Sequence, residues 1–535
     1  MQKRVLGGEG GSRGFFGGSH GKTRTVALIV VAVFGMVATI ALQGLGLGLW
    51  AGASVVVFLV TIRTHRGSPL VRLQARRRWA ERAATGTVVF KPVDTRPPGL
   101  DPTTGSRAER KAKTLEWNAY RDWPDGAEGM HWLQRTPGEP GIAWHVPTGE
   151  DAYLSVAFGV EGAIRGIESD AFLDLAMKAF GAMLARYGSR SMLPKKVQSL
   201  TRTIPVDSAY HEQWVWEQLD PDAVPELIAS YDEVVRLTAD AGLMQRHYFV
   251  VSWPLTAEFM AAARRRGPAQ AGWRALMVTE IESVRSHLVS AKLGKVDPLT
   301  AAQTAAVLRH MQQPSWPIDQ AGDVDVAAPW VASHDELSAT ITDAVSPDGR
   351  PEQWWHRTAL LPIESVETGP RSAMWLTPLL SRMSHQIIRT LSVQIEVVPG
   401  ADARRSARTD VSYDLADLAA QREKGVLTSE DLTAGLTAAR ARLEDLSPGS
   451  GHHGAGWAAH LTISARSRSD LVDATAKITE AAGNAGISSL DWLDTQQAAA
   501  AACTWPIARG MRPIAKSTGS TVRGLLAGAG SKEAI

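Results

Sequence analysis

The chain has 535 residues, of which 44% are hydrophobic and 21% are charged, and its formal net charge is +2 at pH 7. This balance is typical of globular proteins, and the length predicts several domains. The single cysteine, Cys503, excludes a disulfide framework and a thiolate metal cluster within one chain, and it fits a reducing compartment. The near-neutral charge argues against a dedicated nucleic-acid binder.

Two apolar stretches, 25–42 and 45–62, lie back to back near the start of the chain, and neither contains a charged residue. A bilayer crossing needs about 17–25 helical residues, so each stretch is long enough to span. We therefore predict a two-helix transmembrane hairpin over 25–62. The alternatives are a signal peptide and a helical hairpin buried in a protein core.

Basic residues flank this predicted hairpin on both sides, while its connection is uncharged. The positive-inside rule then predicts a plasma-membrane protein with two spans and with both termini in the cytoplasm. Lipid headgroups are expected to contact the cluster Arg76, Arg77 and Arg78. The basic residues on the two sides are Lys3, Arg4, Arg13, Lys22 and Arg24, and then Arg63, Arg66, Arg72, Arg76, Arg77, Arg78 and Arg82.

The next stretch, 63–150, is predicted to be a juxtamembrane basic helix and a linker. Pro97-Pro98 and the Pro/Gly-rich segment 137–141 break any regular pattern there. A short polar helix is expected over 106–123.

Two α+β units are predicted after the linker, over 151–330 and 331–510. In the first unit, apolar periodicity gives the order strand, helix, strand, helix, strand, helix, which suggests a ferredoxin-like layout. The expected elements are strands 153–160, 197–205 and 247–253, with helices 171–187, 222–241 and 269–293. The second unit repeats the theme with strands 357–367, 390–398, 457–465 and 487–494, helices 470–485 and 496–503, and an inserted helical hairpin over 401–447.

The two ends of the chain read as tails. Residues 1–24 are predicted to be a basic mobile tail, and residues 511–535, rich in Gly, Ser and Ala, a disordered one. The predicted fold class is therefore α+β: an N-terminal transmembrane hairpin followed by two ferredoxin-like units with a helical hairpin insertion.

No motif in the chain predicts catalytic, cofactor-binding or metal-binding residues. The segment 17–23 ends in Gly-Lys-Thr like a phosphate-binding loop, but Phe16 stands where the first glycine is needed and an apolar stretch follows. His452, His453 and His460 form no recognisable ligand set. Cys503 follows a run of alanines and is interpreted as a small buried apolar residue rather than a nucleophile.

Two arginine clusters and several tryptophans are candidate binding residues. Arg264–Arg266 and the group Arg404, Arg405 and Arg408 could contact phosphate or an acidic partner, although such runs more often form a solvated face. Direct contact with nucleic acid is thus the less favoured interpretation. Trp214, Trp216, Trp354 and Trp355 are expected to pack in cores or interfaces.

The layout of the chain resembles two components of secretion machines. The hairpin with basic flanks resembles PrgI-type membrane subunits of conjugation systems and the small two-helix subunit of type IV secretion systems. The body resembles the N-terminal, non-motor domain of the type IV secretion ATPase, through Tyr153–Val156, His247–Ser252, 459–463 and Thr504-Trp505-Pro506. In plan, the whole chain is also similar to an uncharacterised family of high-GC Gram-positive membrane proteins.

This resemblance implies a non-enzymatic scaffold without cofactors. The motor domain that would follow in the ATPase is missing, so the chain is expected to anchor and dock a separate ATPase in a conjugation-like or type IV-like secretion apparatus. Implied partners are that ATPase, other channel subunits, the lipid bilayer and further copies of the chain. The alternatives are a component of another export system, such as type VII-like secretion, and a membrane-anchored enzyme with an unrecognised site.

Overall fold

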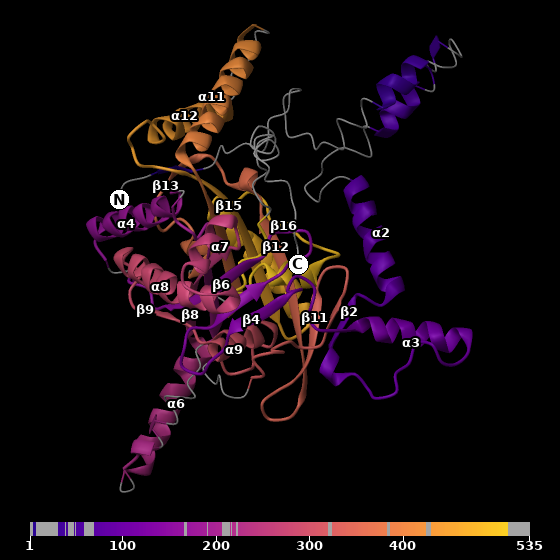
Figure 1. The fold of residues 1–535 in the computed structure, drawn as a ribbon, viewed down its shortest axis with the longest axis vertical. Helices are drawn as coiled ribbons and strands as arrows, with labels where there is room; N and C mark the ends of the chain where they lie inside the picture. The colour runs from indigo at the N-terminus through magenta and orange to yellow at the C-terminus, as the bar shows by residue number, and fades with distance from the viewer. Residues whose placement is uncertain are drawn as a thin grey trace.

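A mixed α+β body built on one 14-stranded sheet dominates the structure (Figure 1). The computed structural model describes residues 4–6, 30–37, 39–40, 48, 50–57, 69–164, 168–189, 191–205, 214–215, 217–220, 223–318, 324–381, 383, 386–423 and 430–511. The α+β class therefore agrees with the sequence prediction, but the predicted transmembrane hairpin does not.

The prediction of a transmembrane hairpin over 25–62 is wrong. None of the helices within the described ranges is long and apolar enough to cross a membrane. Most of the residues of 25–62 that do not belong to the runs 30–37 and 50–57 lie outside the described ones. Hydropathy measures how apolar a segment is, and it does not by itself establish a spanning helix. The predicted two-span topology and plasma-membrane location depended on this hairpin, and the structure does not support them.

The first half of the sheet is built from four antiparallel strands in the order β9-β6-β8-β7. Helix α4 connects β6 to β7, and helices α7 and α8 connect β8 to β9, which is the βαββαβ order of a ferredoxin-like unit. The bounds are β6 Tyr153–Val160, α4 Asp170–Tyr187, β7 Lys196–Pro205, β8 Leu243–Pro254, α7 Ala257–Arg264, α8 Ala269–Ser290 and β9 Val296–Pro298. Helix α6, Pro225–Ala241, is inserted between β7 and β8.

The second half repeats this order with β16-β12-β15-β14. Its insertion, the pair α11–α12, lies between β14 and β15, at the position that α6 occupies in the first half. The bounds are β12 Pro351–Leu361, the 3-10 helix Ile363–Ser365, α10 Thr377–Leu380, β14 Ile388–Val398, α11 Gly400–Glu423, α12 Glu430–Asp445, β15 Gly454–Ala465, α13 Arg468–Asn484 and β16 Asp491–Trp492.

The halves join edge to edge through the antiparallel pair β7–β14. Its register runs from Lys196 opposite Glu396 to Thr203 opposite Arg389. The two predicted units consequently share one sheet rather than forming two.

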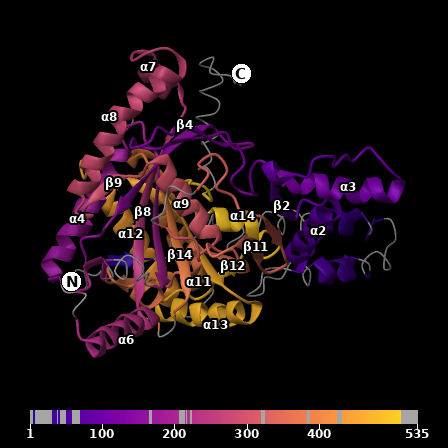
Figure 2. The same cartoon turned by 90° about the horizontal axis from the view of Figure 1, so that it is seen from below.

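Helices cover both faces of the sheet (Figure 2). On one face, α4, α7 and α8 pack against the first half and α13 against the second, with Val397 of β14 in the first core and Leu391 in the second. Helices α9, Ala301–Gln312, and α14, Gln497–Ala502, cover the opposite face with residues up to Ala508. Strands buried on both faces explain the continuous apolar run of β6.

The stretch predicted as a linker is instead part of the sheet. It contributes β2 Val89–Pro92, β3 Tyr120–Arg121, β4 Met130–Gln134 and β5 Ile142–His145, together with helices α2 Pro69–Thr85 and α3 Arg107–Ala119 and the 3-10 helix Val93–Thr95. Strands β10, Ser333–Asp335, and β11, Thr340–Val345, connect β2 to β12. Helix α3 begins where the sequence predicts, because Ser106 and Glu109 form a capping box.

Outside the large sheet, Arg4–Leu6 forms strand β1, which pairs with β13, Gly369–Arg371. These three residues therefore differ from the predicted mobile tail, whose other residues lie outside the described ones. The predicted disordered tail over 511–535 lies outside them as well, apart from Met511.

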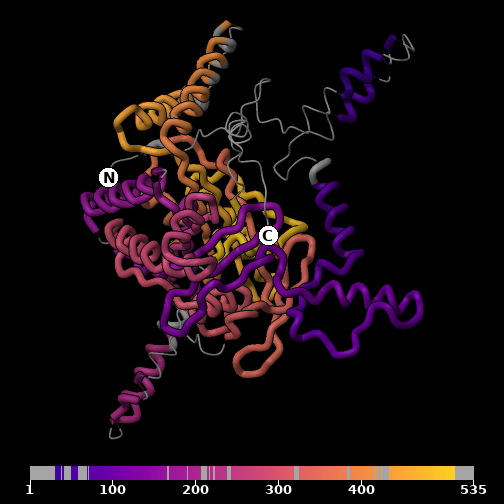
Figure 3. The backbone as a smooth tube through the Cα atoms, viewed as in Figure 1, coloured from indigo at the N-terminus to yellow at the C-terminus, as the bar shows by residue number. Residues whose placement is uncertain are grey.

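Three helical arms extend from the body (Figures 1 and 3). Helix α6 extends at one end of the long axis and the hairpin α11–α12 at the other, while α2 and α3 extend to one side. Such arms present helix faces that are not packed in the hydrophobic cores.

Candidate functional site

Helix α6 carries a stripe of apolar side chains with large exposed fractions. Leu227, Tyr231 and Val234 recur at the i, i+4 and i+7 spacing that places side chains on one helix face. Their exposed fractions are 67%, 44% and 55%. An isolated helix of this length is marginally stable in water, since most helices in proteins are stabilised by burying an apolar face. We call these three residues the α6 stripe.

Acidic residues accompany the α6 stripe along the helix. The described side chains of α6 include Glu226, Asp232 and Glu233, which neighbour the stripe in the sequence. Pro225 at the first helical position and the following Glu226 favour a helix start at this point. The arm therefore presents an apolar line within an acidic field, which suits a partner groove with a basic rim.

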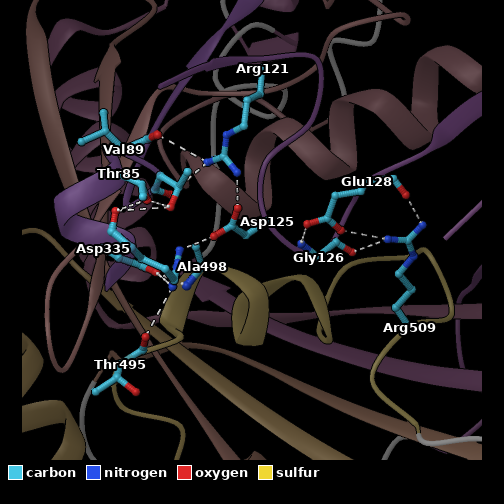
Figure 4. A network of polar contacts seen from close by, with 12 residues as sticks. Thr85, Val89, Arg121, Asp125, Gly126, Glu128, Asp335, Thr495, Ala498 and Arg509 are labelled. Carbon is cyan, nitrogen blue, oxygen red and sulfur yellow. Dashed lines mark hydrogen bonds and ion pairs between the residues drawn. The ribbon is translucent and has the colours of Figure 1, made fainter. Parts of the chain in front are cut away.

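The arm formed by α2 is held to the body by a polar network (Figure 4). Its centre is Arg82, the only basic residue in the last turn of α2. One Nη atom of Arg82 pairs with Asp125, and the other lies 3.1 Å from the carboxylate of Asp335. The same guanidinium donates to the carbonyl oxygen of Thr495 at 3.4 Å. A single side chain thus ties α2 to β10 and to the segment before α14.

The carboxylate of Asp335 is fully buried beneath this arginine. Its other oxygen accepts a 2.8 Å hydrogen bond from the backbone N–H of Ala498, near the start of α14. Burial raises the pKa of Asp335 to about 6, while the positive charge of Arg82 and the Ala498 hydrogen bond lower it in part. At neutral pH the charged form of the Asp335 carboxylate is therefore stabilised by Arg82.

Two further arginines extend the network. Arg121 pairs with the second oxygen of Asp125 and donates to the carbonyl oxygens of Thr87 and Val89 at 3.3 Å. Arg509 donates to the carbonyl oxygen of Gly126 at 2.9 Å, and its guanidinium lies 3.4 Å from the carboxylate of Glu128. Figure 4 shows both arginines pointing at the loop 125–128. This loop is consequently clamped between α2, β2 and the last described segment.

The clamped helix α2 presents basic side chains outward. Arg76, Arg77 and Arg78 are exposed, and Arg77 pairs with Glu81 at 3.1 Å on the helix surface. They form the charged arm surface that the sequence placed against lipid headgroups; in the structure they lie on a helix anchored to the body by Arg82.

The other arginine clusters are distributed differently. Arg264 ends α7 rather than opening α8, and Arg266 donates to Thr279 of α8 at 2.8 Å. Arg404 donates to the carbonyl oxygen of Leu446 at 2.5 Å, and Arg405 lies 3.5 Å from Asp402. Arg408 is exposed. Arg266 thus connects the segment after α7 to α8, and Arg404 connects α11 to the residue after α12.

The residues considered for chemistry do not assemble into a site. Within the described ranges, no group of three or more His, Cys, Asp or Glu side chains could hold a metal ion. The Nδ1 atom of His453 accepts from the backbone N–H of Gly400, and His452 contacts the carbonyl oxygen of Asp445. His460 lies on β15, where burial lowers its pKa to about 4. Lys22 and the Gly-Lys-Thr segment lie outside the described residues.

The remaining predicted residues lie in or beside the cores. Burial raises the pKa of the Cys503 thiol to about 12, so it stays protonated and is a poor nucleophile. Trp354 is buried with the Arg466 guanidinium 4.4 Å from its ring centre, and Trp355 packs against the core of the second half. Trp214 is exposed, and Trp216 lies outside the described residues.

No protein-family model matches the chain, and no curated protein matches it.

Reasoning from sequence missed both the α6 stripe as a surface and the Arg82 network. The stripe had a usable signal, because Leu227, Tyr231 and Val234 follow helical spacing between two predicted strands. The network had none, because Arg82 and Asp335 are 253 positions apart and only the pairing of β2 with β10 brings them together.

Proposed function

We propose that this protein is a non-catalytic scaffold of a conjugation-like or type IV-like secretion apparatus and that it binds a separate ATPase. The observation that carries the proposal is the α6 stripe, an exposed apolar line on an arm that extends away from the core. An amphipathic helix of this kind binds by inserting its i, i+4 and i+7 side chains into an apolar groove.

The charges of the arm support a protein partner. Glu226 and Glu233 accompany the α6 stripe, and opposite charges on the rim of a groove would orient the helix and accelerate association. Fully buried side chains of the size of leucine contribute about 1.5–3 kcal/mol each, so insertion of the stripe would supply several kcal/mol. That gain also offsets the cost of ordering a helix that is marginal by itself.

The fate of the polar residues in the core supports a non-catalytic role. Buried polar side chains near the sheet centre hold neighbouring elements together: Gln198 donates to Trp505 and accepts from Ala508, and Thr358 bonds Thr462. Cys503 is held protonated, and the buried histidines are held neutral by their surroundings. Side chains committed in this way support packing rather than proton transfer.

Affinity capture of the full chain from its own cells tests the proposal. The wild type is expected to retain an ATPase with nucleotide-binding motifs, and Leu227→Glu/Val234→Glu is expected to lose it. Glutamate is a good helix former, so the variant changes the surface more than the helix. Val278→Glu/Val472→Glu is the matched control, because both valines are similarly exposed, at 65% and 61%, on helices α8 and α13.

Capture of no ATPase by the wild type would contradict the proposal, as would equal capture by the stripe variant. The non-catalytic part has its own test. The purified chain is expected to show no ATP turnover, and turnover that disappears in Lys22→Ala would show an enzyme instead.

A further inference from the structure

Arg202 of β7 is buried at the centre of the sheet. It is 1% exposed, and no carboxylate among the described residues supplies a counter-charge to it. Nη1 donates to the Thr390 hydroxyl across the β7–β14 junction at 2.8 Å, and Nη2 donates to the carbonyl oxygen of His310 at 3.0 Å. The Nε atom is buried and has no hydrogen-bond partner.

Such an arrangement is costly unless something neutralises the charge. Burying an ion without a counter-ion costs several kcal/mol, and a guanidinium offers five N–H donors. The two hydrogen bonds of Arg202 use two of them.

Arg389 is a buried arginine of this protein whose guanidinium has hydrogen-bond acceptors on several sides. It is equally buried, at 1% exposed, but it donates to three carbonyl oxygens, those of Leu379, Ile387 and Leu380. Two of these carbonyls belong to the last residues of α10, where the helix end favours a cation. Arg202 has no comparable set of acceptors within the described structure.

A small cavity adjoins Arg202. Its volume is about 20 Å³, enough for one or two water-sized spheres, and its walls come from the sheet, α9 and α14. The described residues that line it include one arginine, no aspartate and no glutamate, and hydroxyl groups predominate among the polar ones: Ser333, Thr340, Thr342, Thr390, Thr462 and Thr504. His356, also in the lining, is kept neutral because burial lowers its pKa to about 4.

We propose that this cavity binds a small inorganic anion of the size and charge of chloride. The ion would accept hydrogen bonds from Arg202 and from hydroxyls such as Thr390, and its charge would balance the guanidinium. The limited volume excludes phosphate, sulfate and larger anions. Because Arg202 bridges β7 to β14 and to His310 next to the end of α9, the anion would fasten the two halves of the sheet and their covering helix.

Chloride titration of stability tests this site. Urea unfolding is followed in sodium chloride and in sodium gluconate at equal ionic strength, since gluconate is too large for the cavity. A ligand that binds only the folded state lowers the unfolding constant by 1 + [L]/Kd, so chloride at ten times its Kd would lower it about 11-fold. Arg202→Met is expected to lose this dependence, whereas Arg389→Met, which removes an equally buried charge, is expected to keep it.

A second measurement keeps the test decisive if Arg202→Met fails to fold. Crystals of the wild type grown or soaked in sodium bromide should show an anomalous peak within hydrogen-bond distance of the Arg202 guanidinium. Equal stability in chloride and gluconate, or equal chloride dependence in Arg202→Met and the wild type, would overturn the proposal. A bromide peak absent from the cavity, with water in its place, would overturn it too.

Discussion

Replacing Arg82 with methionine should detach α2 from the body and destabilise the fold. Methionine keeps much of the apolar stem but removes the charge that faces Asp125 and Asp335. Asp125 keeps its pair with Arg121, so the main loss falls on the fully buried Asp335. Removing one partner of a buried pair costs about 3–5 kcal/mol, and the 26% exposure of the Arg82 side chain favours the lower end, about 3 kcal/mol at pH 7.5.

The destabilisation should depend on pH with a definite sign. The pKa of Asp335 in the folded protein is about 6, above its ordinary value, so its stabilising contribution is complete at low pH and is lost as pH rises through 6. Without Arg82, which lowers that pKa, the loss is greater at pH 7.5. At pH 5 Asp335 is mostly protonated in both proteins, and the difference between them should shrink.

Urea unfolding followed by the fluorescence of the 18 tryptophans measures this effect. Arg77→Met is the control, since Arg77 lies on the same helix, is 82% exposed and makes only a surface pair, which contributes below about 0.5 kcal/mol. The reasoning is refuted if Arg82→Met is no more destabilising than Arg77→Met. It is also refuted if the loss is equal at pH 5 and pH 7.5.

Three further outcomes follow from the same structure. Leu227→Glu should leave the free energy of unfolding within about 0.5 kcal/mol of the wild type, as should Val472→Glu, because both positions are exposed. A much lower unfolding free energy for Leu227→Glu would show that α6 packs on the body. Burial lowers the pKa of His356 to about 4, so its contribution to stability is complete above pH 6.5 and is lost as pH falls; His356→Gln should flatten the fall in unfolding free energy between pH 7 and pH 5, and an unchanged fall would contradict this. Cys503 should react with thiol reagents at least tenfold more slowly in the native protein than in urea, since burial raises its pKa to about 12; equal rates would contradict that placement.

Local chemistry made much of the helical architecture predictable. The Ser106–Glu109 capping box opens α3, and Ser169 caps α4, where the sequence indicates a helix start. Strands β14 and β15 were recognisable from alternating apolar residues, because one face packs on helices and the other carries hydrogen-bonded polar side chains. In each case the determining interactions lie within a few positions of one another.

The pairing of strands that are distant in the sequence could not be predicted from the sequence. Strands β2 to β5 are two to five residues long, too short for a periodic signal, and β2 is paired with β10, which lies far along the chain. The apolar composition of 25–62 predicted a membrane hairpin, although none of the helices in the described part of the chain is long and apolar enough to span a membrane. Arg82 and Arg202 acquired their importance only from the sheet that surrounds them.

Site-specific photo-crosslinking from α6 tests the central claim most directly. A photoreactive amino acid is placed at Tyr231, within the α6 stripe, and at Val472 on α13 as the control, and the adducts formed in cells are identified by mass spectrometry. The scaffold account predicts an adduct with an ATPase that carries nucleotide-binding motifs from position 231 and none from position 472. Adducts that are identical at both positions, or that contain no ATPase at position 231, would contradict it.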